Sequence, residues 1–281
     1  MKKILRWPIF VAKILAIAYL MILVLLMFLE ESMIFFPSKY PQGIWKPGGL
    51  PFEDAEFQAA DGTKLHGWYV PHEHSTATVL FLHGNAGNIT DRVDSLERLH
   101  EVVGASVLIF DYRGYGRSAG KPSEKGIMAD ARAARAWLAK KENIPEREIV
   151  MMGESLGGGV AVDLAAADGA RALVLISTFN RLPDVAAYHY PYFPVRLLMR
   201  TKFDSESKIP NYRGPLLQFH GRDDTIVPFR FGKKLFDAAN EPKELVVSER
   251  HDHNDYVPTS FYEKLKKFLD GLPHEQTPQP K

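Results

Sequence analysis

The chain has 281 residues, of which 46% are hydrophobic and 25% are charged, and this composition is typical of a globular protein with one large core. Its formal net charge of +1 gives no electrostatic reason to expect nucleic-acid binding. Because it contains no cysteine, disulfides, thiolate nucleophiles and cysteine-ligated metals are excluded.

An uncharged apolar run from Ile14 to Leu29 lies near the N-terminus. Together with residues 9–12 and Lys13 it is long enough to cross a hydrocarbon core of ~30 Å. The alternatives are a cleaved signal peptide and a buried helix of a soluble protein. The run is longer than a usual signal-peptide core, and no small-x-small cleavage site follows it. We therefore predict an uncleaved membrane anchor over residues 1–31.

The charges that flank this run predict its orientation. Basic residues precede or begin it and acidic residues follow it: Lys2, Lys3, Arg6 and Lys13 before, Glu30 and Glu31 after. By the positive-inside rule, the N-terminus is cytoplasmic and the catalytic domain lies on the extracytoplasmic side of a single-pass protein. Residues 32–51 are rich in proline and glycine and are expected to be a linker.

From residue 52 the pattern becomes one of strands and helices. An Asp61-Gly62 turn between residues 55–59 and 64–70 predicts an antiparallel hairpin. Apolar runs typical of buried strands follow at residues 78–82, 106–110, 149–152, 172–176, 216–219 and 245–247. Helical patterns separate most of them, as at Asp91–Val103 and from Ser123 to Leu138. Such alternation predicts an α/β domain over residues 52–272, with a mostly parallel central sheet and helices on both faces. The tail, residues 273–281, is predicted to be disordered.

Residues 178–212 interrupt this alternation with four prolines and a group of aromatic residues. The segment falls between two strands and is expected to cross the carboxyl edge of the sheet, where ligands bind in open α/β sheets. It is either a small lid that forms a wall of an acyl pocket or an irregular connection whose aromatic side chains simply pack.

The most informative motif is Gly153-Glu154-Ser155-Leu156-Gly157, which follows an apolar strand and precedes a run of small residues. A G-x-S-x-G sequence between a strand and a helix is typical of a nucleophile elbow, in which a serine lies at the apex of a strained turn. The alternative is a glycine-rich turn with a capping serine. The strand and helix patterns on either side favour Ser155 as a nucleophile.

A serine nucleophile needs a base to accept its proton and a carboxylate to orient that base. The acid candidates are Asp223 and Asp224, which follow a predicted strand. The pattern H-G-x-x-D-x-x-V favours Asp224, and the expected role of Asp223 is in the turn.

The base candidates are His251 and His253, after the last predicted strand. The usual form of this loop, G-x-G-H-N-D, aligns with His253 and has a glycine where this chain has Asp252, so the backbone of the loop is open to question. We predict that His253 is the base and His251 is not. The two histidines do not predict a metal site, because no further ligands stand at a recognisable spacing.

The oxyanion of the tetrahedral intermediate needs two N–H donors. The expected donors are the backbone amide of Leu156, directly after the nucleophile, and that of Asn85 in the glycine-rich loop of residues 83–88. A plain strand-to-helix connection is the alternative for this loop.

Taken together, these segments and Asp111-Tyr112-Arg113-Gly114-Tyr115-Gly116-Arg117-Ser118 resemble the α/β-hydrolase superfamily, and within it the Bem46-like serine hydrolases, over about residues 52–270. The resemblance implies the α/β-hydrolase fold and an esterase or thioesterase that needs no cofactor or metal and acts on a small or lipid-like acyl substrate. Two alternatives are a peptidase or amidase of the same fold and an inactive binding protein.

Overall fold

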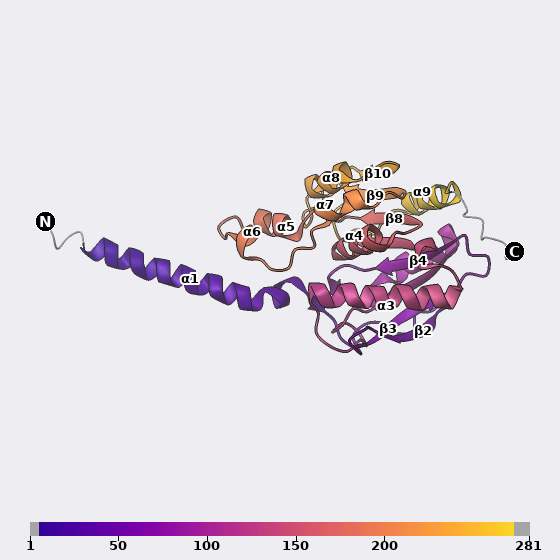
Figure 1. The fold of residues 1–281 in the computed structure, drawn as a ribbon, viewed down its shortest axis with the longest axis horizontal. Coiled ribbons are helices and arrows are strands. Elements are labelled where there is room, and N and C mark those ends of the chain that lie inside the picture. The colour runs from indigo at the N-terminus through magenta and orange to yellow at the C-terminus, as the bar shows by residue number, and fades with distance from the viewer. Residues whose placement is uncertain (1–5, 273–281) are drawn as a thin grey trace.

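The central sheet gives the structure its frame (Figure 1). In the computed structural model, which describes residues 6–272, this sheet has eight strands in the order β10-β9-β8-β7-β4-β6-β3-β2. The strands are β2 (Glu53–Gln58), β3 (Lys64–Val70), β4 (Ala77–Leu82), β6 (Ala105–Phe110), β7 (Val150–Glu154), β8 (Ala172–Ile176), β9 (Leu216–Gly221) and β10 (Lys243–Ser248). Strands β10 to β6 pair in parallel, and β3 and β2 add an antiparallel hairpin at one edge. The predicted fold class is confirmed.

Strands β4, β6 and β8 are largely apolar because both faces of the sheet are covered there. In β4, Leu80 and Leu82 belong to one hydrophobic core, and Val79 and Phe81 belong to the other. This division follows from the two-residue period of a strand, which points successive side chains to opposite faces. All residues of β4, β6 and β8 are buried.

Helices cover the two faces. On one side lie α3 (Glu124–Glu142), α4 (Leu156–Asp168) and α8 (Phe229–Ala238), and on the other lie α2 (Val93–Arg98) and α9 (Thr259–Asp270). The helix expected at Asp91–Val103 is irregular: a 3₁₀ turn precedes α2 and a π turn follows it. The chain then leaves the helix at Gly104, whose φ of +74° suits a residue without a side chain.

Helix α1 (Arg6–Ile34) extends away from the rest of the molecule (Figure 1). Most of its apolar side chains are exposed, and the stretch Trp7–Ile34 is long and apolar enough to cross a membrane. The helix continues beyond residue 31, where the sequence placed the end of the anchor.

The segment expected as a linker, residues 32–51, packs on the domain. After the last turn of α1, β1 (Phe36–Pro37) pairs with β5 (Ala86–Gly87). The side chains of Phe35, Trp45 and Leu50 are buried in the two hydrophobic cores. The prolines and glycines make residues 32–51 irregular, but the segment still packs on the domain. The tail predicted to be disordered, residues 273–281, lies outside the described residues.

Residues 178–212 form an excursion at the carboxyl end of the sheet. It contains α5 (Leu182–His189), α6 (Val195–Leu198) and α7 (Ser205–Lys208). Figure 1 shows α5 and α6 on the side of the domain from which α1 leaves, and contacts described below join them to α1.

Candidate active site

Ser155 lies at the apex of the turn between β7 and α4. Its backbone has φ of +51° and ψ of −117°, a conformation that costs a residue other than glycine about 1–3 kcal/mol. A Cβ atom at Gly153 would lie 2.4 Å from the carbonyl oxygen of Gly157, and one at Gly157 would lie 2.0 Å from that of Leu82. The two glycines therefore allow the close backbone contacts on which this strained turn depends.

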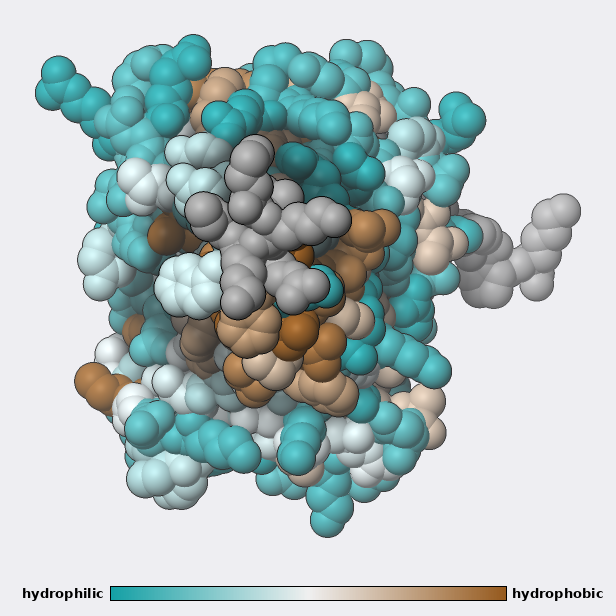
Figure 2. All heavy atoms as spheres, turned by 90° about the vertical axis from the view of Figure 1, so that its left-hand side faces the viewer, coloured by the Kyte–Doolittle hydropathy of each residue, from teal (hydrophilic) through white to brown (hydrophobic). Residues whose placement is uncertain are grey.

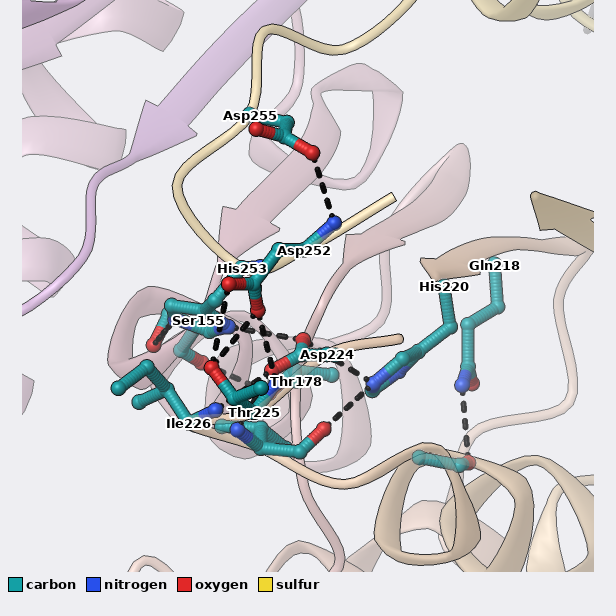
Figure 3. Close-up of polar contacts among 12 residues, drawn as sticks. Ser155, Thr178, Gln218, His220, Asp224, Thr225, Ile226, Asp252, His253 and Asp255 are labelled. Atoms are coloured by element: carbon teal, nitrogen blue, oxygen red, sulfur yellow. Dashed lines mark hydrogen bonds and ion pairs between the residues drawn. The ribbon is translucent and has the colours of Figure 1, made fainter. Parts of the chain in front are cut away.

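Ser155, His253 and Asp224 lie in a hydrogen-bonded row (Figure 3). The Oγ atom of Ser155 is 3.0 Å from Nε2 of His253, and Nδ1 of His253 is 2.8 Å from Oδ2 of Asp224. Because a carboxylate only accepts hydrogen bonds, Nδ1 of His253 carries a proton and donates it. In the neutral ring, Nε2 is then free to accept the hydroxyl proton of Ser155.

Asp224 is buried and bonded on both oxygens. Its Oδ1 accepts hydrogen bonds from the amides of Ile226 at 3.1 Å and Val227 at 2.6 Å. Its Oδ2 is also 3.3 Å from Nε2 of His220. Burial raises the pKa of Asp224, but the hydrogen bonds from His220, His253 and the amide of Val227 outweigh it and lower the pKa to about 2. The carboxylate is therefore ionised at neutral pH, as a partner of an imidazolium must be.

Asn85 and Leu156 lie beside Ser155 at the edge of one cavity. Leu156 is the first residue of α4, so its amide is one of those that lack a partner within the helix. The side-chain amide of Asn85 donates to the carbonyl of Ile34 at 2.6 Å. The backbone carbonyl of Asn85 accepts hydrogen bonds from Phe36 N and Tyr115 Oη. These bonds fix the position of the loop of residues 83–88 next to Ser155.

Known proteins resemble this chain over most of its length. Residues 77–198 match the family model of the alpha/beta hydrolase fold. An uncharacterized protein of Mycobacterium tuberculosis is 42% identical over 231 residues, which are 80% of this chain and 81% of that protein. The alpha/beta hydrolase domain-containing protein WAV2 of Arabidopsis thaliana is 32% identical over 207 residues, which are 68% of this chain and 67% of that protein.

The chain belongs to the α/β-hydrolase superfamily. An esterase of Pyrococcus furiosus has a similar structure, with a TM-score of 0.69 and 26% identity over 84% of this chain and 99% of that one. An uncharacterized membrane protein of Saccharomyces cerevisiae is 32% identical over 228 residues, which are 79% of this chain and 80% of that protein. These likenesses support a hydrolase of the esterase kind.

Asp223 and His251, the other acid candidate and the other base candidate, have different surroundings. Asp223 is exposed in the turn before Asp224. His251 is buried with its ring edge-on to Phe219, the two ring centres being 4.9 Å apart. The structure thus brings Asp224 and His253 to Ser155, and it gives Asp223 and His251 other surroundings.

Asp252, which replaces the expected glycine, holds two loops of the hydrolase together (Figure 3). Its Oδ1 accepts hydrogen bonds from Thr225 N, Thr225 Oγ1 and His253 N, all between 2.8 and 2.9 Å. Asp252 is not one of the four non-glycine residues that have a positive φ in the described part of the chain. The backbone of this loop therefore does not need a glycine, and the carboxylate joins the loop of Asp224 to the loop of His253.

Two supporting residues were not recognised in the sequence. His220 is fully buried and donates from Nε2 to the carbonyl of Val227 at 2.8 Å, beside Asp224. Thr178 donates from Oγ1 to the carbonyl of Ser155 at 2.7 Å. The available signal was a polar residue near the carboxyl end of a buried strand, since His220 lies in β9 and Thr178 two residues after β8.

The cavity beside Ser155 has a volume of about 670 Å³. The elbow, the excursion of residues 178–212 and helix α1 all contribute to its wall, and most lining residues are apolar. Within residues 6–272, no group of three or more acidic, histidine or cysteine side chains is placed to hold a metal ion. The cavity is suited to an apolar acyl group beside Ser155.

Proposed function

We propose that this chain is a membrane-anchored serine hydrolase that cleaves ester or thioester bonds through an acyl-enzyme, and that it is a Bem46-like member of its superfamily. The observation that carries the proposal is the contact of 3.0 Å between Ser155 Oγ and His253 Nε2, at a strained turn beside an apolar cavity. A serine in an ordinary turn does not need a hydrogen bond to an imidazole that is itself bonded to a buried carboxylate.

In the proposed mechanism, Ser155 Oγ attacks the acyl carbonyl while His253 Nε2 takes the hydroxyl proton. The oxyanion receives hydrogen bonds from the amides of Leu156 and Asn85. The C–O or C–S bond then breaks, and the leaving alcohol or thiol takes the proton from His253. Water attacks the acyl-enzyme with His253 again as base, and release of the carboxylic acid restores Ser155. Asp224 keeps its charge throughout and stabilises the imidazolium.

The apolar cavity favours an acyl ester or thioester over a peptide. A peptide substrate brings polar amide groups whose burial without partners costs about 1–3 kcal/mol each, whereas an alkyl chain gains free energy in such a cavity. The esterase from Pyrococcus furiosus supports the same choice.

Labelling with a fluorophosphonate tests the nucleophile. The full-length protein in detergent should react to one label per chain and should hydrolyse p-nitrophenyl acetate, and Ser155→Ala should do neither. The matched control is Ser177→Ala, which alters another buried serine at a positive φ close to the same sheet edge. Labelling of Ser155→Ala equal to that of the wild type would rule out the proposed nucleophile.

We place the N-terminus in the cytoplasm and the hydrolase domain across the membrane, from the basic residues before α1 and the acidic ones after it. The absence of cysteine makes this testable by single substitutions. With an impermeant maleimide, Ala60→Cys, at an exposed turn of the domain, should be labelled in intact spheroplasts. Lys2→Cys should be labelled only after lysis. The reverse pattern would invert the topology.

A further inference from the structure

Helix α1 forms one wall of the cavity that holds Ser155. Leu23, Leu26, Met27 and Ile34 of this helix line the same space as Ser155 and Leu156. From Leu23 to Ile34 the wall extends for roughly 16 Å, at 1.5 Å per residue. The apolar helix therefore has a second role beside any anchoring role, because the surface of the site is incomplete without it.

Specific contacts hold α1 against the excursion. Glu30 is buried, and its carboxylate accepts hydrogen bonds from the amides of Arg200 at 2.9 Å and Thr201 at 2.6 Å. The guanidinium of Arg200 donates to the carbonyl of Met27 at 2.8 Å. A buried carboxylate bonded to two amides fixes both the rotation and the height of the helix, so the wall has a defined register.

A second contact lies three turns earlier on α1. Tyr19 donates from its hydroxyl to the carbonyl of Tyr192 at 3.0 Å, and its ring stacks on that of Phe193 with the centres 6.1 Å apart. The part of α1 before this contact, Trp7 to Ala18, has a length of roughly 18 Å. A hydrocarbon core of ~30 Å needs about 20 residues, so the helix crosses it only if residues beyond Tyr19 lie in lipid as well. The residues of the excursion that contact Tyr19 must then lie in the bilayer too.

The surface of the excursion suits that position. Residues 185–195 contain no aspartate, glutamate, lysine or arginine, and Arg196, the one charged residue of 186–198, is paired with Asp184, its Nε lying 2.7 Å from Oδ1. Several apolar or aromatic side chains of the excursion are exposed. Tyr190, Tyr192 and Leu197 are 50%, 86% and 82% exposed. Figure 2 looks at this end of the molecule along α1, and it shows hydrophobic residues near the centre with hydrophilic ones around them. Exposed tyrosines such as Tyr190 and Tyr192 are typical of the interface between lipid and water.

From these contacts we infer that the tip of the excursion, residues 186–198, lies in the leaflet next to the domain, and that the cavity takes the acyl chain of a membrane-resident ester or thioester directly from the bilayer. This inference rests on the proposed function and adds its substrate class. The chain lies between α1 and the excursion and its carbonyl reaches Ser155, while the polar leaving group faces water. A long-chain substrate thereby avoids the cost of leaving lipid.

A matched pair of helix variants tests the wall. Leu26 lines the cavity, and its neighbour Leu25 is 55% exposed on another face of α1. In full-length protein in detergent micelles, Leu26→Trp should lower kcat/KM for p-nitrophenyl hexadecanoate by about tenfold or more, since one misplaced methylene in an apolar pocket already costs about tenfold. The loss for p-nitrophenyl acetate should be clearly smaller, because a two-carbon acyl group fills less of the cavity than a hexadecanoyl chain does. Leu25→Trp should change neither rate.

The outcomes separate this inference from the proposed function. If the wild type neither hydrolyses acetate esters nor reacts with the fluorophosphonate, the proposed function fails and the inference fails with it. If both occur at Ser155 but Leu26→Trp spares the long-chain ester, or lowers both esters equally, only the inference is overturned.

A measurement of depth does not depend on activity. In phosphatidylcholine vesicles whose acyl chains carry bromine, a nitrobenzoxadiazole dye on Leu197→Cys should be quenched, and the same dye on Ala60→Cys should not. If the dye on Leu197→Cys fluoresced equally in brominated and in ordinary lipid, as the dye on Ala60→Cys should, the excursion would lie outside the bilayer and the inference would be overturned.

Discussion

Replacing His253 with alanine is expected to lower kcat for ester hydrolysis by about 10⁶-fold, because a serine hydroxyl without its base is a poor nucleophile. In the proposed mechanism the imidazole, at 3.0 Å from Ser155 Oγ, also protonates the leaving group, so a single substitution would remove both proton transfers. Steady-state kinetics with p-nitrophenyl acetate measures the loss. Thermal unfolding of the variant checks that the fold is retained.

The control for this variant is the other histidine of the same loop. His251→Phe keeps an aromatic ring against Phe219 and should retain nearly the wild-type kcat. If His251→Phe were inactive while His253→Ala kept its activity, the base would be assigned to the wrong histidine.

Asp224→Asn is expected to lower kcat by about 10⁴-fold without loss of the fold. An amide presents N–H groups where the ring needs an acceptor, so His253 turns its protonated nitrogen toward Ser155 and cannot take the hydroxyl proton. Asp223→Asn alters the exposed neighbour and should stay close to the wild type. A comparable loss of kcat in both variants would point to the turn rather than to the carboxylate.

The lowered pKa of Asp224 fixes the pH range of its contribution. Its folded value of about 2 lies below the ordinary value, so its contribution to stability is present above the unfolded pKa and is lost as pH falls through about 2. Any decline of kcat/KM between about pH 8 and pH 4 therefore arises from protonation of another group. The pH–rate profile of the wild type provides this comparison.

Much of the fold could be predicted because its signals are local. The apolar runs of β4, β6 and β8 are buried on both faces, and only a strand in a covered parallel sheet requires such runs. The elbow could be predicted because Gly153 and Gly157 stand two residues before and two residues after Ser155, between a strand pattern and a helix pattern.

What the sequence could not give depends on contacts between distant segments. Asp252 looked like a departure from the usual loop, because the partner that explains it, Thr225, lies 27 residues earlier. Glu30 looked like a flanking charge of a membrane span, although its carboxylate binds amides 170 residues away. Hydropathy likewise indicated a helix that could span a bilayer without revealing that its second half packs on the excursion.

The docked helix has a consequence for any shortened form of the protein. Membrane hydrolases are commonly made soluble by deleting the N-terminal helix, on the assumption that it only tethers the domain. Here the deletion would remove the acceptor of the Arg200 and Thr201 amides and the side chains that close one side of the cavity. Without α1 this side of the cavity would be open to water, so the substrate range of the shortened protein would differ from that of the full-length chain.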